Sequence, residues 1–336
     1  MRPPTVTRPA PVAPALPEPR GPLSAALVAH LWQRRGPLPD PVVDDPLGDD
    51  DLQLALYGCY ELHYRSFHGV DDAAEWDPEL LAWRSRLEEP FVAALCDAVG
   101  PVDGTDVVAR LNELATAPGP SLSSHMAERG TLEQMREFAV HRSPYQLKEA
   151  DPHTWAIPRL AGAPKAAMVQ VQMEEYGEGV EADMHSTLFA DTLAELDLDP
   201  TYGRYLDVVP GTTLATTNII SLFGLHRRWR GALVGHLALF EMTSVTPMGR
   251  YSDALARLGF GARARRFYDV HVTADQDHEV VAAHHLAGGL ASREPHLADD
   301  IVFGASAASL VEGRFASALL DAWRAGRSSL RAPIPT

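Results

Sequence analysis

Three side chains that can bind a metal ion share a helical spacing in the last third of the chain. His271, Asp275 and His278 occupy positions i, i+4 and i+7 of the stretch YDVHVTADQDHEV. On an α-helix these positions lie within about 60° of one another, so the side chains would leave the helix as one stripe. Imidazole and carboxylate together suit iron, manganese or zinc. Composition alone gives about 0.08 occurrences of this pattern, so the stripe needs partners elsewhere in the chain.

Other ionisable residues interrupt apolar stripes, where burying an unpaired charge is costly. Glu241 does so in LVGHLALFEMTSV, and Glu175 does so on the last turn of AAMVQVQMEEYGEG, where a side chain can move. Glu174 lies one position round the helix and could exchange roles with Glu175. His185 in EADMHSTLFADTL has an apolar face around it, although a lone histidine there is more often a satisfied core residue. Glu149, just before Asp-Pro, resembles an ordinary exposed side chain when taken alone.

Together, these predicted helices offer four carboxylates and three imidazoles. The set consists of Glu149, Glu175, His185, Glu241, His271, Asp275 and His278. It is too large for one tetrahedral zinc ion and too rich in carboxylate for copper. It suits two octahedral-type ions, most simply iron ions bridged by carboxylate.

The elements that must position these residues are predicted to be helices. Apolar residues recur at helical spacing over 23–33, 51–67, 77–100, 102–117, 131–150, 164–176, 181–196, 211–228, 231–246, 248–258, 261–287 and 293–325. The helix at 131–150 could break at Pro144. Alternating patterns with turn dipeptides are nearly missing. The predicted fold class is therefore all-α, a helical bundle with an N-terminal helical extension.

Composition suggests three parts along this chain. The Pro-rich stretch 1–22 is predicted to be a disordered arm. Residues 23–124 would form the helical extension, and residues 125–330 would form the bundle. The boundary is placed at APGPSLSS, residues 117–124, because glycine, proline and serine cluster there.

Charge and cysteine content exclude several classes of protein. A net charge of −16 argues against nucleic acid and anionic membrane as partners. No apolar run reaches the 18 residues of a membrane span, and the N-terminus lacks the apolar core of a signal peptide. Cys59 and Cys96 are too few for a disulfide scaffold and match no zinc spacing. We therefore expect a reducing, cytoplasmic location.

Four stretches carry a resemblance to a known family. KEADPH, EEYGEGVEADMHSTLF, LFEMTS and HVTADQDH, in that order, resemble the haem-oxygenase-like diiron oxidases and oxygenases, also described as iron-containing redox enzymes. The resemblance covers about residues 130–290. In that family the matching positions are iron ligands, which would assign this role to all seven residues above. The role of Glu149 rests almost wholly on this resemblance.

The resemblance also implies a fold and a chemistry. The expected fold is the haem-oxygenase-like helical bundle, with two ferrous ions, O₂ as co-substrate and no haem. Family activities divide between N-oxygenation of amines, guanidines or amino acids and oxidative cleavage, decarboxylation or desaturation of fatty or amino acids. The additional glutamate at 175 resembles the N-oxygenating branch, and we expect Glu175 and His185 to act in catalysis as well as in metal binding.

The expected partners are a small-molecule substrate and an external electron donor of unknown type. No GxGxxG stretch follows a strand, so no bound nucleotide reductant is predicted. The N-terminal helices could form the surface of a homodimer or cover the bundle.

Three other classes of helical protein are less consistent with this sequence. Haem oxygenase proper needs one proximal histidine and no carboxylate cluster. Thiaminase-like relatives of the fold need a cysteine nucleophile inside the bundle, but both cysteines precede residue 100. A metal-free helical binding protein would use the seven positions as ordinary polar residues. The following residues are not expected to bind the metal: Glu61, His63, Asp269, Asp277, Glu279, His284 and His285. The basic stretch 226–230 could meet a substrate carboxylate, but a surface role is favoured.

Overall fold

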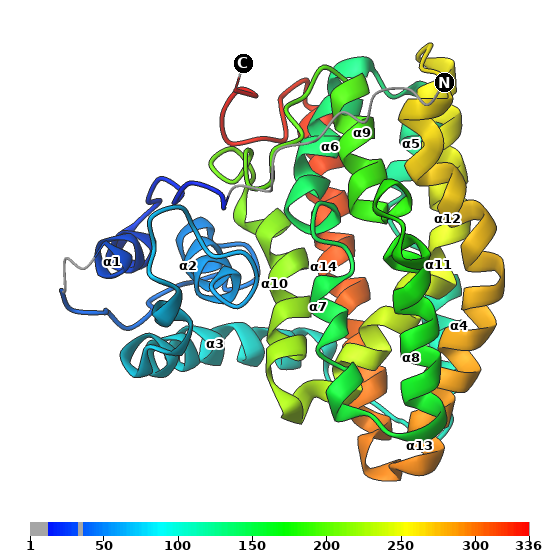
Figure 1. The fold of residues 1–336 in the computed structure, drawn as a ribbon, viewed down its shortest axis with the longest axis horizontal. Helices are drawn as coiled ribbons and strands as arrows, with labels where there is room; N and C mark the ends of the chain where they lie inside the picture. The colour runs from blue at the N-terminus through cyan, green and yellow to red at the C-terminus, as the bar shows by residue number, and fades with distance from the viewer. Residues whose placement is uncertain (1–12, 33–35, 336) are drawn as a thin grey trace.

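The chain folds into a bundle of long helices with a smaller helical extension at one side. The computed structural model describes residues 13–32 and 36–335. For residues 273–278 it describes the backbone but not the side chains. Within the described residues the regular structure is helical and contains no strand, which confirms the all-α prediction. Figure 1 shows the first three helices beside the bundle, which the later helices form.

The helices have the following bounds. The N-terminal third contains α1 (Pro22–Leu31), α2 (Asp50–Glu61), α3 (Pro78–Val99), α4 (Val107–Thr116) and α5 (Leu122–Arg129). The remainder contains α6 (Leu132–Gln146), α7 (Asp151–Thr154), α8 (Gly162–Glu175), α9 (His185–Glu195), α10 (Gly211–Leu225), α11 (Arg230–Arg257), α12 (Ala262–Val280), α13 (Gly289–Arg293) and α14 (Ala298–Arg324). A π-helix, Val281–Gly288, joins α12 to α13. No helix in the described ranges is long and apolar enough to cross a lipid bilayer.

Side-chain caps fix where several helices begin. Asp49, Asp77 and Asp106 each accept a hydrogen bond from a backbone amide in the first turn of α2, α3 and α4. Thr131 and Gln134 form a reciprocal capping box at the start of α6. These caps satisfy amides that have no partner within their own helix.

Helix α11 is continuous where two helices were predicted, at 231–246 and 248–258. Proline at 247 removes one backbone hydrogen bond, which normally bends or ends a helix. Tertiary contacts hold both halves here. In the first half Gly235 lies against Ile301 of α14, and in the second half Arg257 donates to the carbonyl oxygens of Met126 and Ala127 in α5.

The N-terminal arm also differs from its prediction. The amide of His68 donates to the carbonyl of Pro14 at 2.8 Å, and the amide of Glu18 donates to Asp207 Oδ1 at 2.8 Å. Arg20 donates to the carbonyl of Leu206. The predicted disorder over 1–22 is therefore wrong for residues 13–22. Proline costs little entropy to order, and packing gains decide the outcome. Residues 1–12 lie outside the described part of the chain.

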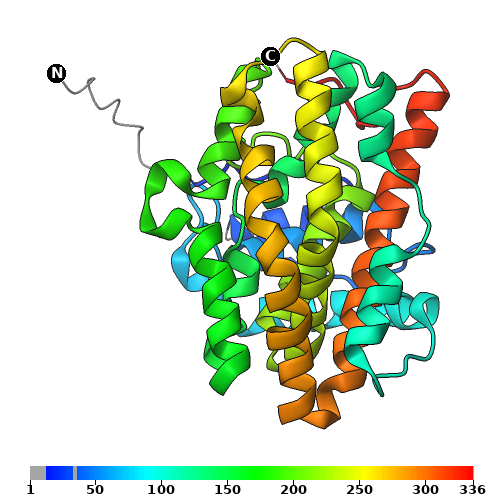
Figure 2. The ribbon, with the colours of Figure 1, turned by 90° about the vertical axis from the view of Figure 1, so that its right-hand side faces the viewer.

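The extension is fastened to the bundle through α2 and α10, which pack together. The side-chain amide of Asn218, fully buried in α10, donates at 2.8 Å both to the carbonyl and to the side-chain oxygen of Gln53 in α2. A buried amide that makes these bonds fixes the register between the two helices. In Figure 2 the axes of α12 and α14 lie roughly parallel, and α12 runs from top to bottom of the view whereas α14 runs from bottom to top.

Close approach between α11 and α14 depends on glycine. A Cβ added at Gly304 would lie 2.0 Å from the carbonyl oxygen of Ala232, whereas a Cβ at Gly313 of the same helix would meet nothing within 4 Å. We expect Gly304→Ala to lower the free energy of unfolding by about 1–3 kcal/mol, because the backbones must move apart. Gly313→Ala should raise it by up to about 1 kcal/mol through helix propensity. Urea denaturation of both variants tests this, and equal effects would contradict it.

His141 joins α6 to α10 and to the C-terminal segment. Its Nδ1 lies 2.7 Å from Thr213 Oγ1, and its Nε2 lies 3.0 Å from Ser329 Oγ. Burial lowers the pKa of the imidazole from 6.5 to about 3. As the pH falls below 6.5, the unfolded chain therefore binds a proton that the folded chain refuses, and stability is lost.

This shift makes a testable prediction about acid stability. Between pH 6 and pH 4, approximately, the free energy of unfolding of the wild-type protein should fall more steeply than that of His141→Gln, which has no titrating group there. The difference in slope should approach about 1.4 kcal/mol per pH unit. Denaturant titrations at several pH values measure both slopes. Parallel curves for the two proteins would show that the imidazole is not held neutral.

Candidate metal centre

Four of the seven predicted ligands meet inside the bundle. Glu149, Glu175, His185 and His271 each present one donor atom, and these four atoms all lie within 4.8 Å of one another. All four residues are buried. They come from separate elements: the turn between α6 and α7, the end of α8, the start of α9 and the middle of α12. Folding therefore gathers residues that are up to 122 positions apart in the sequence.

A tight connection brings two of these residues together. Glu175 is the last residue of α8, and His185 is the first residue of α9. Gly177 lies between them with a φ of 61°, and a Cβ there would come within 2.4 Å of the carbonyl carbon of Asp183. Only glycine tolerates both the left-handed backbone and this close approach. The Glu-Tyr-Gly-x-Gly run therefore shapes the chain reversal that pairs the carboxylate with the imidazole.

The spacing of these donors fits a metal ion. His185 Nδ1 lies 2.9 Å from Glu175 Oε2. Neighbouring ligands on an octahedral ion with bonds of about 2.1 Å lie about 3 Å apart, and opposite ligands lie about 4.2 Å apart. The separation between His185 Nδ1 and Glu175 Oε2 is thus that of neighbouring ligands on one ion.

The ring of His271 is oriented for the same purpose. Its Nδ1 lies 2.7 Å from the carbonyl oxygen of Phe267 one helical turn earlier. A carbonyl can only accept, so Nδ1 carries the proton and Nε2 keeps its lone pair. The imidazoles of His185 and His271 lie with centroids 4.2 Å apart and planes tilted by 51°, and Phe267 packs against both rings. This arrangement is typical of metal-binding histidines, whose second nitrogen is fixed by a hydrogen bond.

The other three predicted ligands are not among these four described donors. Glu241 of α11 is buried and lines a cavity of about 60 Å³ with Glu149, Glu175 and His271, but it lies outside the group of four donors. Asp275 and His278 belong to α12, and their side chains lie outside the described residues. Their role as ligands stays a prediction.

Burying several carboxylates together has an electrostatic consequence. Glu149, Glu175 and Glu241 line the same cavity with 9%, 5% and 6% of their surfaces exposed. Burial, together with the negative charges of these three residues, holds the pKa of the Tyr145 phenol well above its usual range. The Tyr145 hydroxyl therefore stays protonated. Like charges buried this closely repel one another, and a divalent cation is what offsets them.

Three residues of this region were missed from the sequence. Tyr145 and His153 line the cavity, and the Tyr145 hydroxyl lies 3.5 Å from His153 Nδ1. His153 Nε2 lies 3.2 Å from Nδ1 of His236, which is fully buried in α11. Burial lowers the pKa of His153 to about 4 and holds the pKa of His236 well below its usual value. His236 stands among apolar neighbours in sequence, where a lone polar residue is indistinguishable from core. Tyr145 and His153 lie in the mixed stretch SPYQLKEADPHTW and interrupt no apolar stripe.

The residues that were set aside have other partners or are exposed. Glu61 pairs with Lys148, and His63 lies between Glu75 and Arg84. In the basic stretch, His226 pairs with Glu88 and Arg230 pairs with Glu294. His284, His285 and Glu279 are exposed on the surface. Ser252 donates to Asp269, and Asp277 lies outside the described side chains.

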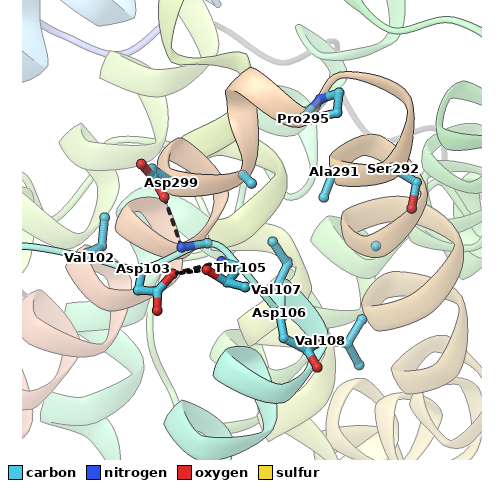
Figure 3. A pocket seen from close by; sticks show the side chains of 13 residues that line it. Val102, Asp103, Thr105, Asp106, Val107, Val108, Ala291, Ser292, Pro295 and Asp299 are labelled. Carbon is cyan, nitrogen blue, oxygen red and sulfur yellow. Dashed lines mark hydrogen bonds between the residues drawn. The ribbon is translucent and has the colours of Figure 1, made fainter.

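A larger hollow elsewhere does not have the chemistry of a metal site. It measures about 750 Å³ and lies between the segment before α4 and the segment around α13 (Figure 3). Its carboxylates serve the backbone: Asp299 accepts from the amide of Gly104, Asp103 accepts from Thr105, and Asp106 caps α4. The lining contains no imidazole or thiol.

The fold and the centre together define a class of protein. A helical bundle that gathers inward-facing carboxylates and imidazoles from several helices is the architecture of metal-dependent bundle enzymes. The family model described as iron-containing redox enzyme matches residues 136–313, just over half of the chain. The chain belongs to this family, which confirms the resemblance seen in its sequence, and it has the haem-oxygenase-like all-helical fold.

Two individual proteins are similar to this chain. Nitrosourea synthase from Streptomyces achromogenes subsp. streptozoticus is 29% identical over 203 residues, which are 58% of this chain and 43% of the synthase. The chain therefore spans less than half of the length of that relative. The crystal structure of a CADD-like protein of unknown function from Nostoc punctiforme covers 65% of this chain and 97% of its own, with a TM-score of 0.53 and 15% identity. That likeness supports the fold alone.

The choice between two adjacent glutamates can be tested directly. Glu175 is buried within the group of four donors, whereas Glu174 is half-buried and lies outside the group. We expect Glu175→Gln to weaken ferrous binding by at least about tenfold, because a neutral amide is a poor ligand for a hard cation. Glu174→Gln should bind iron as the wild type does. Anaerobic titration of the metal-free proteins measures both affinities. If Glu174→Gln weakens ferrous binding and Glu175→Gln does not, Glu174 is the ligand instead.

Proposed function

We propose that this protein is a non-haem diiron oxygenase that uses O₂ to oxygenate a nitrogen atom of a small amine or amino acid. The observation that carries the proposal is the convergence of Glu149, Glu175, His185 and His271 within 4.8 Å. Hard carboxylate oxygens combined with imidazole nitrogens suit ferrous iron.

A second ion would be held by the remaining candidates. Glu241 lines the same cavity, and Asp275 and His278 follow His271 at one and two helical turns along α12. Glu149 and Glu175 each have two oxygen atoms and could contribute to both ions. The cavity of about 60 Å³ has the scale of ions and ordered waters.

The reaction balances with an external electron donor. Conversion of R–NH₂ and O₂ to R–NHOH and H₂O consumes two electrons and two protons. Two ferrous ions held by these residues would supply the two electrons, and a separate reductant would have to restore them after each turnover. The substrate amine and this reductant are the partners that the proposal requires.

The chain's own residues would supply positioning and protons. The raised pKa of Tyr145 keeps a proton on its hydroxyl at the cavity wall, where it can donate to an oxygen atom. Behind it, His153 and His236 are neutral and can exchange a proton between Nε2 and Nδ1. Phe267 packs against the rings of His185 and His271 and excludes water from this side.

The likeness to nitrosourea synthase supports oxygenation at nitrogen over carbon–carbon cleavage. A nitrosourea carries a nitrogen–oxygen bond, and the shared region covers 203 residues. Because the chain spans less than half of that relative, the substrate of this protein need not be the same.

The proposal predicts a definite stoichiometry and a definite product. Anaerobic titration should load two ferrous ions per chain. Single-turnover mixing with ¹⁸O₂ and a panel of amines and amino acids should give a product heavier by one ¹⁸O atom on nitrogen, detected by mass spectrometry. Glu175→Gln should lose this product, and Glu174→Gln should keep it. Carbon dioxide or an alkene formed from acids, without nitrogen oxygenation, would favour oxidative cleavage. A protein that binds no iron would refute both.

A further inference from the structure

The candidate ligand Glu149 stands outside regular helix. α6 ends at Gln146 and α7 begins at Asp151, so residues 147–150 form a turn. A ligand within a helix keeps its place through the hydrogen bonds of that helix, whereas a ligand on a turn depends on whatever holds the turn. The contacts of this turn and of its two flanks therefore decide where the Glu149 carboxylate lies.

One of these contacts is a buried ion pair with the N-terminal extension. The ammonium of Lys148 donates to Glu61 Oε2 at 2.8 Å, and both side chains are almost wholly shielded from solvent. The Tyr202 hydroxyl donates to the same oxygen at 2.7 Å. Lys148 Nζ also lies over the rings of Tyr57 and Tyr64, 4.9 and 4.3 Å from their centroids. Such a pair resists separation, because removing one partner leaves an uncompensated buried charge.

Arg65, four residues after the end of α2, makes a second contact with the turn. The guanidinium of Arg65 donates to the carbonyl of Leu147 at 3.1 Å and lies 3.9 Å from Asp151 Oδ2. Asp151 Oδ1 accepts a hydrogen bond of 2.8 Å from the hydroxyl of Tyr176. Tyr176 directly follows Glu175. One polar network therefore touches the flanks of both candidate carboxylate ligands.

Glu61 and Arg65 also contact each other, since the amide of Arg65 lies 3.3 Å from Glu61 Oε1. Both residues precede the region 136–313 that defines the family. We propose that they are positioning residues: the N-terminal extension holds the turn 147–150 through them and so sets the affinity of the metal centre. This inference rests on the proposed function, because it takes Glu149 as a metal ligand. It assigns to the extension a direct part in building the site.

The test compares ferrous affinity among full-length variants, titrated anaerobically after removal of metal. Glu61→Gln keeps the shape of the side chain and removes its charge, and Arg65→Gln removes the bond to Leu147. Each should weaken ferrous binding by about tenfold, the usual effect of losing a residue that orients a ligand. Circular dichroism checks that the helices remain.

A matched control separates positioning from general destabilisation. Arg230 and Glu294 form another partly buried ion pair, which joins the start of α11 to the segment between α13 and α14. Glu294→Gln should lower stability without changing ferrous affinity. If Glu61→Gln fails to fold, the double variant Glu61→Gln/Lys148→Met removes both buried charges, and it should fold yet still bind iron weakly.

The outcomes distinguish this inference from the proposed function. Wild-type affinity in folded Glu61→Gln, or in the double variant, together with wild-type affinity in Arg65→Gln, would overturn the inference. An equal loss of affinity in Glu294→Gln would overturn it too. If Glu149→Gln itself leaves ferrous binding unchanged, the role of Glu149 in the proposed function fails instead. If Glu149→Gln binds iron weakly while the Glu61 and Arg65 variants bind it as the wild type does, Glu149 is a metal ligand. The extension then has no part in positioning it.

Discussion

Burial of several carboxylates around one small cavity is the constraint on which the rest of this structure depends. Glu149, Glu175 and Glu241 are removed from water together, and their repulsion opposes folding unless positive charge joins them. The buried lysine and arginine side chains that the structure describes pair with carboxylates outside the cavity: Lys148 with Glu61, Arg84 with Glu88, and Arg230 with Glu294. A bound cation would offset this repulsion, which is a physical reason to interpret the cluster as a metal centre.

The same constraint explains why helices end in the middle of the bundle. Glu175 closes α8, His185 opens α9, and Glu149 lies on the turn between α6 and α7. Donors at helix ends can converge from several directions, whereas donors along one helix form only a stripe. Interior helix ends, however, lack the partners that a continuous helix provides for its backbone. The polar contacts made by Arg65 and the glycine conformation at 177 are the local features that make these ends tolerable.

The helices were largely predictable from the sequence, because apolar periodicity reflects burial on one face. The haem-oxygenase-like class followed from the order of four short stretches that resemble the family. Glu175 and His185 carried a signal of their own, since each lies on an apolar helix face. His271 carried one through its helical spacing with Asp275 and His278. The turn at Glu149 was not predictable, because local pattern extends the helix to residue 150 and only contacts with α2, remote in sequence, show where α6 stops. Continuity of α11 through Pro247 likewise depends on packing that no local window contains.

Two titratable residues that line the cavity, His153 and Tyr145, are uncharged at neutral pH. A protonated histidine beside the carboxylates would compete with iron for their charge, and Glu175 does favour the protonated form of His153. Burial outweighs that attraction and lowers the pKa of His153 to about 4, so the imidazole is uncharged at neutral pH. Tyr145 shows the opposite response to the same surroundings, since its raised pKa also preserves the neutral form. Desolvation thus keeps both His153 and Tyr145 uncharged beside the carboxylates, so neither side chain adds a positive charge that would repel a bound cation.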